Sequence, residues 1–204
     1  MTMLVLDPAE ERRLKRERAL TGADRFDEVW DGVYIMSPLA NNEHQFFAVE
    51  LALVIRQVVT APTEGLVFAG VNVSDREEKW KKNYRCPDVA VFLKGNPAQD
   101  RDTHWFGGPD FAVEVVSPGD RSRDKLDFYA GVGVRELLIV DRKPWRLELY
   151  RLDGSRRRPV AVATPKKPVQ LTSEVLQLRF TLRAAKPRPQ LVASTVDGKR
   201  EWTI

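Results

Sequence analysis

Apolar residues recur along the chain with different periods, and each period predicts one kind of element. A group of them between positions 47 and 58 returns at helical spacing and predicts one buried helix face: Phe47, Leu51, Val54, Ile55 and Val58. Asn42, followed three residues later by Gln45, resembles a capping box. We therefore expect the main core helix to begin at Asn42 and to run to about Thr60.

Short runs in the second half of the chain are apolar at consecutive positions, as in strands buried on both faces. They cover residues 88–93, 111–116 and 135–140. Residues 123–133 predict a short helix that glycines end. Residues 145–152 alternate as a half-exposed strand does, and we expect them to form a hairpin with the run before them.

The flanking segments carry weaker patterns. Residues 10–20 predict a short charged helix, and residues 26–36 predict a β-hairpin that turns at Asp31-Gly32. Residues 65–73 are typical of one strand. Weaker strand patterns follow at residues 160–163, 169–171 and 176–180.

Charge is distributed unevenly along the chain. Residues 151–204 hold 12 Lys and Arg against 4 Asp and Glu, whereas residues 1–150 hold 21 against 25. Residues 183–204, with Pro187 and Pro189, lack a core-building pattern, and we expect them to form a basic C-terminal tail. Such a flank can bind nucleic-acid phosphates or form a solvated surface, and the sequence leaves both interpretations open.

Composition narrows the class of protein. A chain of 204 residues, 43% of them hydrophobic, can bury the core of one α/β domain. The single cysteine, Cys86, excludes an internal disulfide, and with only 2 histidines the chain cannot assemble a Cys/His zinc cluster. No stretch approaches the ~20 apolar residues of a membrane helix, and residues 1–20 have no apolar signal core. We therefore expect a cytoplasmic protein.

Two acidic residues occupy positions where burial is expected. Glu114 lies in mid-strand among valines, and Asp88 opens another buried strand directly after Pro87. A carboxylate there is costly unless it is paired, protonated or bound to a cation. Two acids on neighbouring strands could hold a hard cation such as Mg²⁺. The alternative is a buried salt bridge of Glu114 with Lys125 or Arg85.

Lys125 lies on the expected helix that follows the Glu114 strand. Because the chain doubles back at residues 117–119, its ammonium could return toward the carboxylates. There it could orient a water nucleophile or stabilise charge on a phosphate. A surface lysine on an amphipathic helix is the alternative interpretation.

Particular strings of residues carry a family resemblance. They are PDVAVF at residues 87–92, FAVEVVSPGDRSRDKLDFYAGVGVRELLIVDR at 111–142 and WRLELY at 145–150. With the patterns E-V-x-S-P and Y-x-x-x-G-V they resemble the Uma family of putative restriction endonucleases, over residues 27–180. The resemblance implies one restriction-endonuclease-like α/β domain of the PD-(D/E)xK type over residues 1–182. Its central mixed sheet would be flanked by helices and extended by β-hairpins.

The resemblance also implies roles for individual residues. The metal-binding aspartate and glutamate of the family match Asp88 and Glu114, its lysine matches Lys125, and the histidine early in its core helix matches His44. On its own, His44 is equally typical of a capping or packing residue. The (D/E)xK motif has its lysine two positions after the acid, where this chain has Val116. The resemblance therefore implies that the amine comes from the following helix.

These inferences lead to a metal-dependent nuclease, specifically a DNA endonuclease that uses Mg²⁺ or Mn²⁺ and pairs two copies as a homodimer. The alternative is a non-catalytic module that retains the nuclease fold and binds nucleic acid or protein through its basic C-terminal segment. The amino-acid sequence predicts neither DNA over RNA nor the nucleotide sequence that is recognised.

Overall fold

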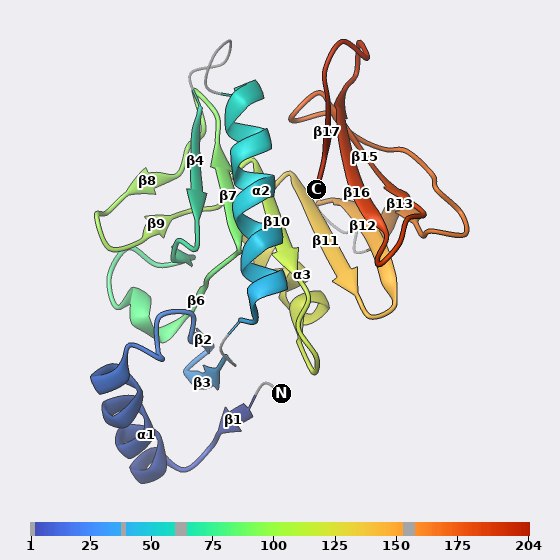
Figure 1. Cartoon of the computed structure of the whole chain (residues 1–204). Helices are drawn as coiled ribbons and strands as arrows, with labels where there is room; N and C mark the ends of the chain where they lie inside the picture. The colour runs from blue at the N-terminus through green and yellow to red at the C-terminus, as the bar shows by residue number, and fades with distance from the viewer. Residues whose placement is uncertain (1–2, 38–39, 60–64, 153–157) are drawn as a thin grey trace.

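The computed structural model describes residues 3–37, 40–59, 65–152 and 158–204. A mixed sheet forms its centre (Figure 1). The strands follow the order β13 (Pro159–Ala163), β12 (Trp145–Arg151), β11 (Glu136–Arg142), β10 (Phe111–Val115), β7 (Val89–Phe92) and β4 (Leu66–Ala69). β10 and β11 run parallel, and the other neighbours are antiparallel. The expected α/β class with a central mixed sheet is confirmed.

The two faces of β10 pack against different helices. Val113 and Val115 belong to the core cluster that contains the buried face of α2 (Asn42–Val59). Ala112 belongs to the cluster around α3 (Leu126–Gly131). Because side chains alternate across a strand, Glu114 projects on the α3 face with Ala112.

Helix α2 begins where the sequence predicts, but its cap lies one residue earlier. The backbone N–H of His44 donates to Oδ1 of Asn41 at 2.9 Å, so Asn41 and not Asn42 satisfies a free amide of the first turn. The helix ends at Val59, and the predicted end at Thr60 lies outside the described residues.

A second sheet contains the N-terminal hairpin. Its order is β1 (Met3–Val5), β3 (Val33–Met36), β2 (Glu28–Trp30), β6 (Tyr84–Arg85), β5 (Val73–Ser74), β9 (Trp105–Phe106) and β8 (Gln99–Asp100). β2 and β3 are joined at Asp31-Gly32, both with positive φ, as predicted. The charged helix α1 (Pro8–Thr21) begins after Asp7, which accepts hydrogen bonds from its first amides.

The predicted single strand over residues 65–73 is wrong. The segment divides into β4 and β5, which belong to different sheets. Gly70 lies between them with a φ of +67°, and its N–H donates to the backbone oxygen of Asp88 at 3.1 Å. The turn therefore needs a glycine and also contacts the residue that opens β7.

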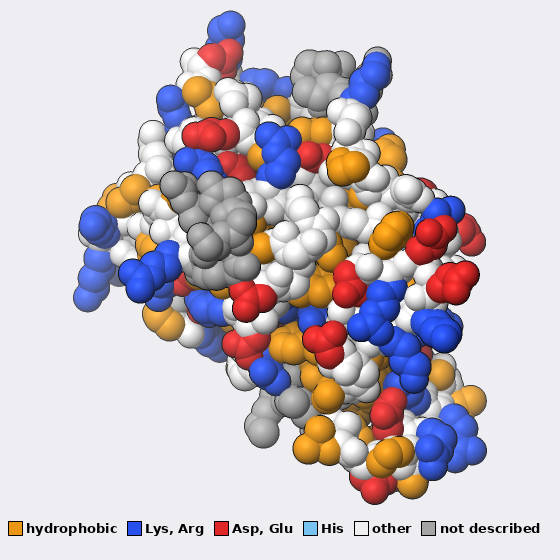
Figure 2. Space-filling model, turned by 180° about the vertical axis from the view of Figure 1, so that it is seen from behind, with side chains coloured by type: hydrophobic (Ala, Val, Ile, Leu, Met, Phe, Trp, Pro, Cys, Tyr) orange, Lys and Arg blue, Asp and Glu red, His pale blue; other side chains and the backbone are white. Residues whose placement is uncertain are grey.

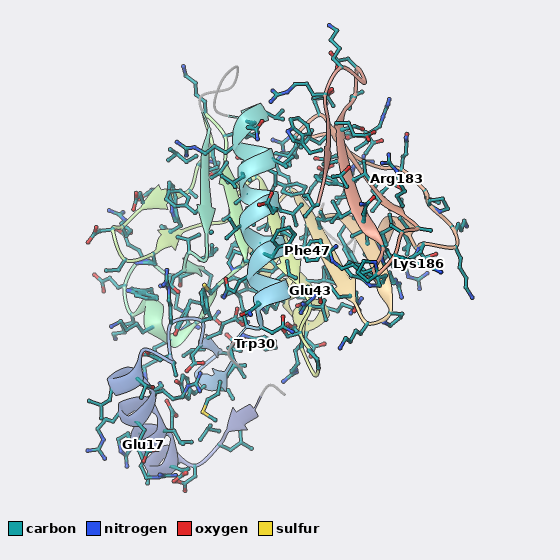
Figure 3. The ribbon with its side chains drawn as sticks, in the orientation of Figure 1. Glu17, Trp30, Glu43, Phe47, Arg183 and Lys186 are labelled. Carbon is teal, nitrogen blue, oxygen red and sulfur yellow. The ribbon has the colours of Figure 1, made fainter. Side chains whose placement is uncertain are left out.

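The expectation of a C-terminal tail is also wrong. Residues 190–203 form strands of a third sheet, with the order β14 (Leu171–Ser173), β15 (Leu178–Arg183), β16 (Gln190–Thr195) and β17 (Glu201–Thr203). Leu191 and Ala193 are buried in the main core, which stabilises β16 despite the prolines before it. Arg183 ends β15 and pairs with Glu201 at 3.0 Å, and Lys186 lies in the connection to β16; Figure 3 labels both.

Basic side chains do not form one continuous patch on the face shown in Figure 2, where acidic side chains lie among them. Within the described ranges, no helix is long and apolar enough to cross a membrane.

Candidate active site

A cavity of about 410 Å³ opens beside the central sheet and the N-terminal hairpin. Its walls come from the start of α2, the residues directly before β7, the end of β10, the β2–β3 hairpin and the segment 117–125. The residues singled out in the sequence all line it: His44, Asp88, Glu114 and Lys125. Segments far apart in the chain therefore converge on one space.

The sheet register brings the two predicted acids together. Val113 pairs with Val89 in the antiparallel β7–β10 ladder, so extending this register by one residue places Glu114 opposite Asp88. The Asp88 carboxylate also accepts a hydrogen bond from the N–H of Val115 at 2.7 Å. This bond fixes the Asp88 side chain against the end of β10.

Glu114 is buried, with 2% of its surface exposed, and several donors surround it. Nζ of Lys125 lies 3.0 Å from each carboxylate oxygen, the Tyr129 hydroxyl donates to Oε1, and Ser122 Oγ lies 3.5 Å from Oε2. Burial raises the pKa of Glu114 to about 8; the Lys125 ammonium opposes this shift, and the neighbouring Asp88 and Glu28 carboxylates add to it. Its charged form therefore depends on a nearby cation.

Lys125 reaches the acid from a 3₁₀ turn, η2 (Ser122–Lys125), directly before α3. Burial alone would lower the pKa of its ammonium, but Glu114 and Glu28 raise it well above the usual value. The alternative inferred from the sequence, an ion pair of Glu114 with Lys125, is thus present. Arg85 is not the partner, since its guanidinium donates to the backbone oxygens of Val29 and Tyr84.

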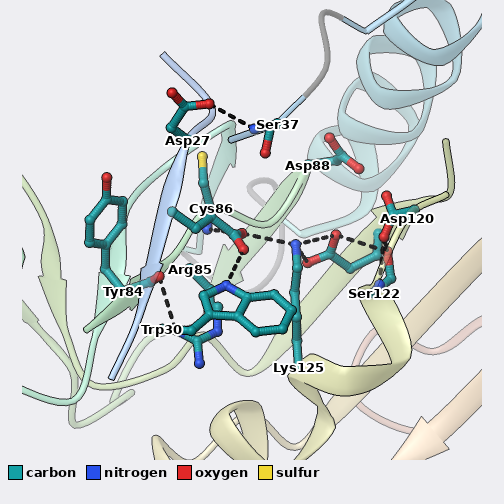
Figure 4. Close-up of polar contacts among 12 residues, drawn as sticks. Asp27, Trp30, Ser37, Tyr84, Arg85, Cys86, Asp88, Asp120, Ser122 and Lys125 are labelled. Carbon is teal, nitrogen blue, oxygen red and sulfur yellow. Dashed lines mark hydrogen bonds and ion pairs between the residues drawn. The ribbon is translucent and has the colours of Figure 1, made fainter. Parts of the chain in front are cut away.

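Glu28 also lines this cavity, and the sequence did not predict it. From β2, its Oε1 accepts from Nζ of Lys125 at 2.9 Å and from the N–H of Cys86 at 2.8 Å, while Oε2 accepts from Nε1 of Trp30 at 2.7 Å. Nζ of Lys125 thus contacts the carboxylates of both Glu28 and Glu114, and Figure 4 draws the dashed contacts of the labelled Lys125. The signal was an acidic residue inside a short strand, the same signal that singled out Glu114.

His44 lies in the first turn of α2, with 7% of its surface exposed. Its Nε2 is 3.3 Å from Oδ2 of Asp88. Its Nδ1 is buried and has no hydrogen-bond partner among the residues described. His44 therefore lines the cavity beside Asp88, and among the described residues it forms no hydrogen bond or ion pair with Glu114 or Lys125.

The donor set fits a hard cation in part. Across the described ranges no group of three or more His, Cys, Asp or Glu side chains is arranged to hold a metal ion. However, Mg²⁺ in proteins takes as few as one or two carboxylates and keeps several waters. Four carboxylates line the cavity, those of Glu28, Asp88, Glu114 and Asp120, against three cationic side chains, those of Lys125, Arg25 and Arg121. The remaining excess of negative charge suits a divalent cation.

Comparisons with known proteins agree with this architecture. Residues 16–185 match the protein family Uma2, described as "Putative restriction endonuclease". No curated protein matches the chain. A solved structure described as a putative nuclease belonging to DUF820, from Anabaena variabilis ATCC 29413, is similar in fold with a TM-score of 0.58. It is 17% identical in sequence, and the match covers 74% of this chain and 83% of that one.

Proposed function

Since the chain belongs to the Uma2 family of putative restriction endonucleases, we propose that it is a divalent-metal-dependent nuclease whose active site is the cavity around Asp88, Glu114 and Lys125. One observation carries the proposal. Two acids from adjoining strands and one amine from the next turn meet at one cavity, with the amine 3.0 Å from the second acid.

Asp88 and Glu114 are the proposed ligands of Mg²⁺ or Mn²⁺. When bound, such a cation would polarise a phosphoryl oxygen and lower the pKa of a bound water. A cation beside Glu114 would also favour its charged carboxylate, which burial disfavours in its absence. The Val115 amide and His44 hold Asp88 in place for this role.

Lys125 is the proposed source of positive charge toward the substrate. An ammonium held beside the reaction position can stabilise the negative charge that grows on a phosphate during attack by water. Glu28 and Glu114 keep this side chain charged and fixed. Tyr129 acts indirectly, because its hydroxyl donates a hydrogen bond that orients the Glu114 carboxylate.

The substrate that we propose is DNA, cut internally by a cytoplasmic enzyme. A duplex needs both strands cut, which two copies of one site can do, and for this reason we propose a homodimer.

Cleavage of supercoiled plasmid tests the function. We expect nicking by the wild-type protein with Mg²⁺ or Mn²⁺, none with EDTA, and a loss of about a hundredfold or more in Asp88→Ala. Glu78→Ala, which removes one exposed carboxylate outside the cavity, serves as the control and should cleave normally. Cleavage that persists in EDTA or in Asp88→Ala would refute the proposal.

One observation favours the alternative of a non-catalytic binding module: Lys125 already neutralises Glu114. Such a module would bind DNA without cutting it, and its affinity would not depend on Asp88. Because residues 190–203 form strands, a truncation would disturb the fold. The exposed Lys166 and Lys186 should therefore be replaced by alanine, which would weaken binding by this module in a salt-dependent way.

A further inference from the structure

Two arginines line the same cavity, each against an aromatic ring that also lines it. The guanidinium carbon of Arg121 lies 4.9 Å from the centre of the Trp30 ring, and that of Arg25 lies 5.5 Å from the Phe26 ring. Both distances are within the range of cation–π attraction. The cavity thus combines acids with two arginines that come from different segments of the chain.

The Trp30 ring is fixed from several directions. Its Nε1 donates to Glu28 at 2.7 Å, and the buried guanidinium of Arg85 lies 4.6 Å from its ring centre. Arg85 is itself held by backbone oxygens. Arg121 therefore lies against an immobile surface, which reduces the entropy that its side chain would lose on binding an anion.

Neither arginine is neutralised strongly by the protein. Arg121 donates to Asp124 at 2.6 Å, but both side chains are partly exposed, at 36% and 52%, so solvent weakens the pair. Arg25 is exposed and forms no ion pair with any residue that the structure describes. Both guanidinium groups are therefore available to an anion that enters the cavity, and guanidinium binds phosphate in bidentate geometry.

We propose that Arg25 and Arg121 bind backbone phosphates other than the one attacked, so that the site takes a polynucleotide chain in preference to a small phosphodiester. The inference rests on the proposed function and assigns two residues that position its substrate. The acids take the cation, and the two arginine–aromatic pairs hold neighbouring phosphates of the same chain.

Salt dependence of binding tests the inference without relying on cleavage. Fluorescence anisotropy of a labelled DNA duplex is measured between about 50 and 200 mM salt with Asp88→Ala protein as the reference. Arg25→Ala and Arg121→Ala, each in that background, should reduce the slope of log affinity against log salt by about 0.9, and the double variant by about 1.8. Arg12→Ala, an exposed arginine of α1 that does not line the cavity, should leave the slope unchanged.

A comparison of two substrates completes the test. In a chain with Asp88 intact, each arginine substitution should reduce kcat/KM about tenfold on DNA and much less on bis(p-nitrophenyl) phosphate, which has no neighbouring phosphates. Unchanged slopes, or equal losses on both substrates, would overturn the inference. If Asp88→Ala alone abolishes cleavage while the slopes do not change, the proposed function stands and this subsite fails. If no protein cleaves DNA but the slopes fall, the arginines bind DNA phosphates and the proposed nuclease function fails.

Discussion

Glu28 and Lys125 lie 97 positions apart in the chain, yet Nζ of Lys125 donates to Oε1 of Glu28 at 2.9 Å. The bond joins the N-terminal hairpin to the turn before α3. Because both side chains are buried, the bond is stronger than the same contact would be in water. The hairpin is thus part of the candidate active site and not an accessory to the central sheet.

Replacing Glu28 by glutamine should lower the rate of cleavage. The Glu28→Gln side chain keeps its size but loses the charge that holds the Lys125 ammonium in place. We expect kcat to fall about tenfold with little change in KM, because the ammonium acts in the transition state more than in substrate binding. Plasmid-cleavage kinetics measure this effect. Glu78→Gln is the control, and a wild-type kcat in Glu28→Gln would contradict the positioning role.

Removing the ammonium should destabilise the fold. Lys125→Met leaves the buried Glu114 without its cation, and such a loss typically costs about 3–5 kcal/mol. Adding Glu114→Gln removes one of the two buried carboxylates that then lack their cation, so the double variant should be more stable than Lys125→Met alone. Urea unfolding measures both values. Equal stability of Lys125→Met and the wild type would show that the pair is not a buried ion pair in solution.

Divalent metal should stabilise the protein before any substrate is added. A cation that binds only the folded state raises its stability by about 2.7 kcal/mol at one hundred times its Kd. We expect the unfolding temperature to rise with Mn²⁺ or Mg²⁺, to return to its original value with EDTA, and to respond little in Asp88→Ala. Calorimetry provides the measurement. A rise of the same size in Asp88→Ala would place the metal elsewhere.

Glu148 should make the stability of the fold depend on pH in the acidic range. Its side chain is fully buried, and the pKa of its carboxyl is lowered from 4.5: burial opposes this shift, but hydrogen bonds from Arg123 and Tyr150 outweigh it. A lowered folded pKa means that the stabilisation is complete above the ordinary value and is lost as pH falls through the folded value. Glu148→Gln should therefore be less stable than the wild type at neutral pH, and the gap should close in acid.

Urea unfolding of the wild type and of Glu148→Gln over a range of pH measures that gap. Glu201→Gln, which removes one half of an exposed pair with Arg183, serves as the control and should show little effect at any pH. If the difference in unfolding free energy between the wild type and Glu148→Gln stays constant down to strongly acidic pH, the charged Glu148 carboxylate is not what stabilises the wild type.

The central sheet could be predicted because its strands are local patterns. β10 is apolar on both faces except at Glu114, so the periodicity located the strand and singled out the acid at the same time. The α2 stripe was equally clear. Lys125 and His44 depended on the family resemblance, since a lysine or a histidine on a helix has ordinary explanations.

Glu28 and the C-terminal strands were missed for a different reason. Whether an acid in a short hairpin faces solvent or a distant lysine depends on how two sheets pack, and no local period encodes that packing. β16 follows two prolines, and its burial comes from contact with the main core. Tertiary packing decided both cases.

Because η2 and not β10 provides the amine, Val116 is free to pack against the α3 cluster in place of a lysine. The strand and the amine are thereby independent: the strand side chains can be selected for packing of the core, while the ammonium that we propose to act in catalysis is positioned by the turn that follows. In such a scaffold the separation of the acid and the lysine along the chain, 11 positions here, is not fixed by the chemistry. What must be preserved is the position of the ammonium relative to the acids.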